Sequence, residues 1–183
     1  MHFTKPGPEN TDDTLKLVRE EIEEKRIEYV VVASTTGSTG VKAAKMFKDL
    51  KVKLIVVTHN VGFKEPGGQE IEPEYKSEIE RLGGTVYTGT MVLRSLGRAI
   101  KNSVGYSDNE IVAQVLRMFS QGIKVCVEIV AMAADAGLIP PTDVIAVAGT
   151  GRGADTACLI SADSSHRFFG IKVREILAKP REF

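Results

Sequence analysis

The sequence predicts an α/β protein in three layers, with a mostly parallel β-sheet between two layers of helices. Three observations lead to this prediction. Runs rich in Val and Ile, without alternating polar residues, recur along the chain, as expected for strands that are buried on both faces. Segments with apolar residues at helical spacing stand between these runs, and that alternation is typical of parallel sheets. Two of the runs end in clusters of Gly, Ser and Thr, which suits loops at the carboxyl edge of such a sheet.

The length and charge of the chain limit the classes of protein it can belong to. With 183 residues, 43% of them apolar, it is long enough for one domain with a full core. We expect a single domain over residues 1–183, in which residues 1–10 form an extended lead-in because they contain two prolines and a glycine. The 24 Lys and Arg residues balance the 24 Asp and Glu residues. Since there is no basic excess and no polybasic block, neither a nucleic-acid partner nor a membrane surface is expected.

Location and redox state follow from other absences. The beginning of the sequence lacks the apolar core of a signal peptide, and no apolar run approaches the roughly 20 residues of a membrane span. A cytoplasmic location is therefore expected. Cys126 and Cys158 stand in apolar surroundings, without a CxxC pair or a His at metal-binding spacing. We expect both to be reduced and buried, and we expect no metal site.

The first helix is predicted to begin at the amino-terminal side of a regular apolar stripe. Thr11 or Asp12 can cap it, and the stripe consists of Leu15, Val18 and Ile22. A buried strand follows at 28–33.

The middle of the chain continues the alternation. A helix is predicted at 38–50 and a second buried strand at 53–58. Residues 59–73 form a long polar loop, a length that is typical of a lid or a binding element. The predicted helix 74–82 ends at a Gly-Gly pair, and a short third strand follows at 85–88.

The second half begins with helices. One is predicted at 92–102, and a longer one begins at Ser107, where Glu110 completes a capping box. This helix is predicted to break near Gly122 and to end at Gly137.

Two strands and a tail complete the chain. The strands are predicted at 143–148 and 156–162. The tail 171–179 fits either an edge strand or a short helix, and alternation of apolar with charged residues favours the strand.

The loop after the first strand is the strongest functional signal. It consists of Ser34, Thr35, Thr36, Gly37, Ser38 and Thr39, directly before a helix. The first amides of a helix lack partners within the helix and carry partial positive charge, so this loop is predicted to bind a phosphate or another anion. It does not match the GxxxxGK[ST] pattern, which argues against nucleoside triphosphate hydrolysis. The alternative is a polar connection whose hydroxyls make only turn and capping bonds.

A second loop follows the fourth predicted strand. It consists of Gly149, Thr150, Gly151, Arg152 and Gly153. Arg152 between two glycines is placed to bind a phosphate or a carboxylate, or else it is a solvated surface charge. No helix clearly follows this loop, which argues against a dinucleotide fingerprint.

Thr58, His59 and Asn60 end the second strand at the same edge. His59 is a candidate for a hydrogen bond to a ligand or for proton transfer near neutral pH, and the alternative is a purely structural role. Spacing alone assembles no catalytic acid–base pair, so the catalytic residues stay unassigned.

Two stretches resemble the C-terminal domain of pyruvate kinase, VVVASTTGSTGVKAAKMFKDLKVKLIVVTHN and DVIAVAGTGRGADTACLI, and the resemblance spans about residues 28–162. It is strongest to stand-alone, largely archaeal proteins that contain only this alpha/beta domain. The resemblance implies a five-stranded sheet of order 3-2-1-4-5 with the last strand antiparallel, so that the two glycine loops meet. In several pyruvate kinases the corresponding loops bind a sugar-phosphate activator. The catalytic barrel of pyruvate kinase has no counterpart in this sequence, so no pyruvate kinase activity is expected.

The stand-alone family further implies flavin mononucleotide (FMN) as the ligand. We therefore expect a domain that binds a phosphorylated small molecule, FMN first among the candidates. The alternatives are a flavin-dependent oxidoreductase with His59 as proton donor, or a metabolite-sensing regulatory or scaffold domain that forms a homo-oligomer.

Overall fold

A computed structural model describes all residues 1–183. Seven strands form one sheet in the order β1-β7-β6-β5-β2-β3-β4. Only β6 runs antiparallel to its neighbours β5 and β7. The strands are β1 His2–Phe3, β2 Tyr29–Ala33, β3 Lys53–Val57, β4 Thr85–Tyr87, β5 Asp143–Ala148, β6 Thr156–Ser161 and β7 Lys172–Pro180.

The predicted core of the sheet is confirmed. The five expected strands appear as β4-β3-β2-β5-β6, which is the order 3-2-1-4-5 with the last strand antiparallel. Two further strands extend the sheet beyond that expectation. The tail forms β7, as the alternation of its side chains favoured, and His2–Phe3 pair with Lys179 and Pro180 as β1. The remainder of the lead-in 1–10 includes a short 3-10 helix, η1 (Pro8–Asn10).

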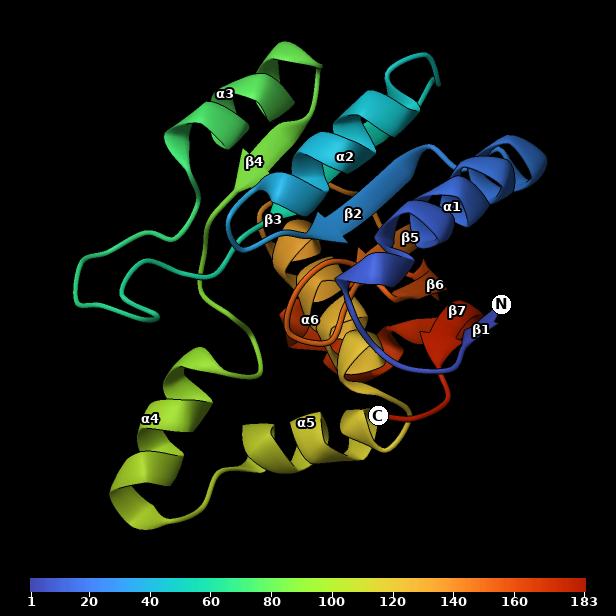
Figure 1. Cartoon of the computed structure of the whole chain (residues 1–183). Coiled ribbons are helices and arrows are strands. Elements are labelled where there is room, and N and C mark those ends of the chain that lie inside the picture. The colour runs from blue at the N-terminus through green and yellow to red at the C-terminus, as the bar shows by residue number, and fades with distance from the viewer.

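Helices cover both faces of the sheet (Figure 1). On one face, α1, α2 and α3 pack against alternate strand residues such as Val30, Val32 and Ile145. On the other face, α6 packs against the residues between them, such as Val31 and Ala146. The helices are α1 Thr11–Lys25, α2 Ser38–Phe47, α3 Pro73–Arg81, α4 Ser95–Val104, α5 Asp108–Arg117 and α6 Gln121–Asp135, with a second 3-10 helix, η2, at Ser165–Gly170. No helix combines the length and the apolar composition needed to cross a bilayer.

The long helix predicted after Ser107 is two helices, as the expected break implied, but the break lies before Gly122. Ser120 caps α6, because its Oγ accepts the amide of Ile123 at 3.1 Å. Gly122 lies inside α6, where its lack of a side chain lets the helix approach Thr156.

The predicted capping box at Ser107 is wrong. Ser107 occupies the N-cap position of α5, but its hydroxyl accepts no bond from the helix. The physical reason is competition for Glu110, whose carboxylate pairs with Lys101 at 3.9 Å and Arg117 at 3.1 Å instead of turning back to the N-cap amide.

Helices α4 and α5 form an arm that projects from the body of the molecule (Figure 1). Large apolar side chains along the arm are exposed, among them Leu96, Val104, Ile111 and Met118. This arm separates β4 from α6 in the chain.

The two cysteines are free and buried, as predicted. The Sγ atom of Cys126 lies 3.4 Å from the carbonyl oxygen of Ala146 and donates to it. Burial, followed by the neighbouring Cys158, raises the pKa of the Cys126 thiol well above its ordinary value. Both thiols are therefore packing groups of the core.

Candidate functional site

Three of the predicted loops leave neighbouring strands at one edge of the sheet. In the parallel register of β2 with β3, Ala33 lies opposite Val57, and β2 pairs on its other side with β5. The loops that begin at Ser34, Thr58 and Gly149 therefore start side by side. The amide of Ser34 donates to the carbonyl oxygen of Val57 at 2.9 Å and extends this pairing by one residue. The two glycine loops begin on adjacent strands, as the predicted order of strands requires.

The amides of the first loop face away from any protein acceptor. From Thr35 to Thr39, no backbone N–H donates to a backbone or side-chain atom of the protein. The next amide, of Gly40, donates to Ser34 Oγ at 3.1 Å, and Ser34 is buried. Ser34 thus fixes the turn, while the five preceding amides stay free at the positive end of α2. Among the hydroxyl side chains, those of Thr36 and Ser38 are exposed, whereas Thr39 is buried.

Close packing explains why glycines stand in and after this loop. Gly37 has a φ of 105°, and a Cβ there would lie 2.6 Å from the Cβ of Tyr75 on α3. Gly40 lets α2 lie directly on the sheet, because a Cβ would meet Val56 and Ile79 at 2.8 Å. The loop and the first turn of α2 are therefore held in one position by β3 and α3.

The buried carboxylate of Asp155 holds the second loop, residues 149–153, in place. Asp155 is fully buried, and its Oδ2 accepts the amides of Thr150 at 3.1 Å and Gly7 at 3.3 Å. Its Oδ1 accepts the hydroxyl of Thr156 at 2.7 Å. The lead-in segment therefore helps to build the site, since it supplies one of these donors and packs against Gly153 through Pro8.

Two side chains of the second loop have no protein partner. The Oγ1 atom of Thr150 exposes less than 1 Å² and makes no hydrogen bond. Arg152 is exposed, and its guanidinium forms neither a hydrogen bond nor an ion pair. A buried hydroxyl without a protein partner is unusual, and a water molecule or a ligand would have to satisfy it.

His59 is oriented by contacts that the sequence did not predict. Its Nδ1 lies 2.8 Å from Glu70 Oε2, and its Nε2 lies 3.4 Å from Thr35 Oγ1. The ring of Phe63 packs on the imidazole with 3.9 Å between centroids, and the guanidinium of Arg94 lies 4.6 Å from the Phe63 ring. Glu70 was missed because it lies in the polar loop 59–73, where no periodicity shows which side chain turns back. The loop returns to the site, since the amide of Glu72 donates to the carbonyl oxygen of Thr36 at 2.9 Å.

Thr58 and Asn60 bond to neighbouring protein groups. Thr58 is buried, and its Oγ1 lies 2.6 Å from the hydroxyl of Thr88. Asn60 accepts the hydroxyl of Ser95 at 3.2 Å and donates to the carbonyl oxygen of Val61. Both side chains position the connections that follow β3 and β4.

A buried ion pair was also missed. Lys124 and Glu128 on α6 are 2% and 1% exposed and contact each other. Glu128 Oε1 also accepts the amide of Leu93 at 2.7 Å, which ties the start of the arm to α6. Burial lowers the pKa of Lys124, and the attraction of Glu128 opposes that shift.

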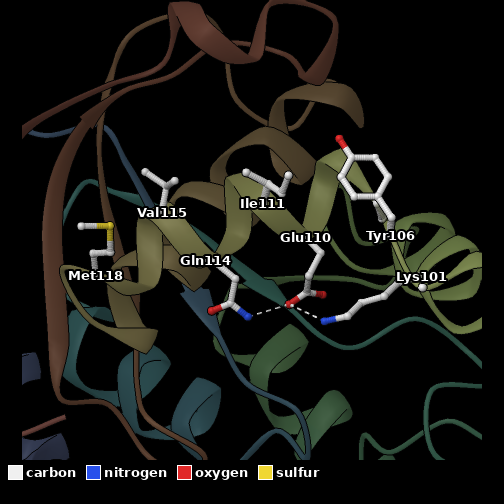
Figure 2. A pocket seen from close by; sticks show the side chains of 9 residues that line it. Lys101, Tyr106, Glu110, Ile111, Gln114, Val115 and Met118 are labelled. Carbon is white, nitrogen blue, oxygen red and sulfur yellow. Dashed lines mark hydrogen bonds and ion pairs between the residues drawn. The ribbon is translucent and has the colours of Figure 1, made fainter.

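A separate groove of about 520 Å³ lies on the arm, away from the loops (Figure 2). Burial opposes the ionisation of Glu110 in this groove, but Lys101 and Arg117 outweigh it and lower the pKa of the carboxyl. Tyr106, Ile111 and other apolar side chains complete the lining. None of the residues predicted from the sequence to bind a ligand lies there. No group of three or more His, Cys, Asp or Glu side chains is arranged to hold a metal ion.

Comparison with known proteins identifies a matching family. The profile described as "Pyruvate kinase, alpha/beta domain" matches residues 12–160. Two solved structures of pyruvate kinase from Cryptosporidium parvum are also similar. One has 14% sequence identity over 79% of this chain and a TM-score of 0.41, and the other, solved in complex with ADP, has 15% identity over 88% and a TM-score of 0.45. The chain spans only 21% and 25% of those two proteins.

Proposed function

This chain belongs to the pyruvate kinase alpha/beta domain family, and from that premise we propose that it binds a phosphorylated small molecule at the carboxyl edge of its sheet. The observation that carries the proposal is the row of unpaired amides from Thr35 to Thr39 at the start of α2. Because the family match concerns the alpha/beta domain alone, the proposal is one of binding, without pyruvate kinase activity.

The donors of the two loops suit a phosphate dianion. Backbone amides at a helix start bind anions through both hydrogen bonds and the helix dipole. The neighbouring loop adds the unpartnered hydroxyl of Thr150 and the free guanidinium of Arg152. Ser34 contributes indirectly, since its bond to the Gly40 amide sets the turn. In this arrangement the amides fix the position of the phosphate, while Arg152 supplies a mobile positive charge.

FMN is the favoured ligand. Its phosphate would lie on the row of amides, and its planar ring would extend toward His59, whose Nε2 lies 3.4 Å from Thr35 Oγ1, and toward Phe63, which packs on the His59 ring. A bound flavin would supply hydride and electron transfer. The chain's own groups would hold the phosphate, orient the ring and shield one side of it.

A second candidate, a flavin-dependent oxidoreductase, is favoured by the orientation of His59. Glu70 holds Nδ1, so Nε2 faces Thr35 at the edge of the phosphate loop. A ring held in this way is placed to give or take a proton at Nε2. Stopped-flow reduction of the FMN-loaded protein by NADH or NADPH tests this candidate. If the rate is no faster than that of free flavin and is unchanged by His59→Ala, the oxidoreductase candidate is rejected and only the binding proposal remains.

Riboflavin is the matched control for the leading proposal, because it differs from FMN only by the phosphate. We expect the fluorescence of FMN to be quenched when the protein is titrated into it, and we expect FMN to raise the melting temperature of the protein. At a hundred times its dissociation constant it should add about 2.7 kcal/mol to the free energy of unfolding. Riboflavin should bind more than tenfold more weakly, and Arg152→Gln should weaken FMN but not riboflavin. Arg181→Gln, at an exposed arginine that directly follows β7, three strands away from β2, is the control variant.

The proposal fails if neither FMN nor sugar phosphates shift the melting temperature at millimolar concentration. It also fails in its central claim if FMN and riboflavin bind equally well, because the amides would then contribute nothing.

A further inference from the structure

Three side chains from separate segments form a hydroxyl–imidazole–carboxylate chain at the edge of the sheet. Thr35 Oγ1 lies 3.4 Å from Nε2 of His59, and Nδ1 of His59 lies 2.8 Å from Oε2 of Glu70. The side chains of His59 and Glu70 are 30% and 26% exposed, so the chain of contacts is shielded but reachable from solvent.

With Glu70 ionised and His59 neutral, the two contacts of the imidazole assign its tautomer. An ionised carboxylate only accepts hydrogen bonds, so Glu70 requires the hydrogen of the neutral imidazole to be on Nδ1. Nε2 of His59 then carries a lone pair, and the hydroxyl of Thr35 donates to it. This is the proton arrangement of an activated hydroxyl nucleophile, with a base that is oriented by a third group. The 3.4 Å contact between Thr35 and His59 is long for a hydrogen bond, as catalytic hydrogen bonds often are before substrate binds.

The surroundings of the three groups hold them in place. Phe63 packs on the imidazole ring, and the bond from the Glu72 amide to the Thr36 carbonyl oxygen keeps the segment with Glu70 against the first loop. The free amides that follow Thr35 in the chain are donors for a developing negative charge, because they are fixed by α2 and pair with no protein atom.

We propose that Thr35 is the nucleophile of an acyl-transfer centre that acts on small carboxylic esters, with His59 as its base and Glu70 as the positioning residue. The carboxylic ester is the substrate class because it combines an electrophilic carbon with an oxygen that gains charge on attack. The proposal is limited to small esters because Thr35, His59 and Glu70 do not line the groove on the arm, so a large acyl group has no lining there to hold it.

The reaction is balanced by one proton that moves through His59 in each half of the reaction. Thr35 Oγ1 bonds to the acyl carbon while its proton passes to Nε2 of His59. The bond from the acyl carbon to the alcohol oxygen then breaks, and His59 returns the proton to the leaving alcohol. Water attacks the acyl-threonine, gives a proton to His59, and the proton returns to Thr35 as the acid leaves.

This centre does not depend on phosphate binding, but it shares the free amides with the proposed phosphate site. Phosphate or FMN bound there would therefore inhibit acyl transfer competitively. The two proposals are separable, because ligand binding is measured by melting temperature and acyl transfer by product release.

The test uses p-nitrophenyl acetate with the full-length chain. We expect nitrophenolate release with saturation, and an acetyl group on Thr35 after an acid quench and peptide mass spectrometry. Thr35→Val and His59→Asn should each lower the rate at least 100-fold. Thr35→Ser should retain activity and carry the acetyl group at position 35. Glu70→Gln should lower kcat at least tenfold with little change in KM, which a purely structural contact would not do.

Free imidazoles also cleave this ester, so the controls are chosen to measure that background. His166→Ala removes an exposed histidine outside the site, and Thr90→Val removes an exposed hydroxyl after β4. Both variants should stay within about twofold of the unmodified chain, since neither group belongs to the proposed centre. If Thr35→Val unfolds, the acetylation site in the unmodified chain and in Thr35→Ser decides the question.

Equal rates for Thr35→Val and the unmodified chain at equal melting temperature would overturn the proposal. Loss of the activity in His166→Ala, or an acetyl group found only at lysines or other histidines, would overturn it as well.

Discussion

Removal of the Asp155 carboxylate should be among the most damaging single changes outside the apolar core. Its two oxygens accept the amides of Gly7 and Thr150 and the hydroxyl of Thr156, and the residue is fully buried. Asp155→Ala leaves these three donors without an acceptor, and each buried donor left unpaired costs about 1–3 kcal/mol. Water that enters after the change will pair with some of these donors, so we expect a total loss of about 3–6 kcal/mol in the free energy of unfolding. That loss is a large share of the stability of a typical domain.

The variant Asp155→Asn keeps the shape of the side chain, so its comparison with Asp155→Ala separates the effect of lost hydrogen bonds from that of lost volume. The Asn carbonyl can take the place of Oδ2 for both amides, and its NH₂ group can donate to the Thr156 hydroxyl, so a loss of only about 1–2 kcal/mol is expected. Asp143→Asn, at a half-exposed surface pair with Arg174, should change stability by less than about 1 kcal/mol.

Urea unfolding followed by circular dichroism gives the free energy and the m-value for each variant. A cost below about 1 kcal/mol for Asp155→Ala, with an unchanged m-value, would refute the assignment of this carboxylate as the support of the second loop. The same variant should weaken FMN binding, because Thr150 and Arg152 lose the anchor of their loop.

Three further outcomes are expected. Both cysteines should resist a thiol reagent such as dithionitrobenzoate in the folded protein and react fully in guanidinium chloride, because burial keeps the pKa of Cys126 high; reaction in the native state would contradict this. The hydrogen bond from Arg19 lowers the pKa of Asp49 to about 2 in the folded state, so this carboxylate stabilises the fold above its ordinary pKa of 3.8 and that contribution is lost as the pH falls toward 2. Asp49→Asn should therefore flatten the fall of the free energy of unfolding between these two pH values in acid titrations, and an unchanged slope would count against the pairing. Glu128→Gln should cost about 3–5 kcal/mol in urea unfolding because it leaves Lys124 buried without its partner, whereas Lys124→Met combined with Glu128→Gln should recover most of that loss and keep the acceptor for the Leu93 amide.

The sheet could be predicted because its signals are local and strong. Strand cores such as LIVV at 54–57 are buried on both faces, and each is bounded by glycine or polar residues. The two ends of the sheet were harder, because β1 has only two residues and is defined by its pairing with Lys179 and Pro180 rather than by its own pattern. The break between α5 and α6 depends on a single capping hydroxyl, that of Ser120, which the helical spacing of the apolar residues does not single out.

The candidate site also has a part that could be predicted from the sequence and a part that could not. The positions of the two glycine loops followed from the order of the strands, and the register of β2 with its neighbours places them side by side. Glu70 and Asp155 could not be recognised, because their importance comes from what they accept across 11 and 148 residues of chain, as the bonds to His59 and Gly7 show. Periodicity describes which face of an element is buried, and it carries no information on where an isolated carboxylate turns.

The start of α2 differs from that of α6 in how its hydroxyl residues are used. At α6 one hydroxyl, that of Ser120, accepts a helix amide and leaves the end buried and capped. At α2 the chain has four hydroxyl residues directly before or within the first turn, yet only the earlier Ser34 accepts a helix amide. An uncapped start is shared with α1, α3, α4 and α5, which have no side-chain cap either. What sets α2 apart is the number of hydroxyl residues that stand beside its free amides without pairing with them. Together with the unpartnered hydroxyl of Thr150 on the adjacent loop, this pattern favours an external anion over a self-sufficient turn.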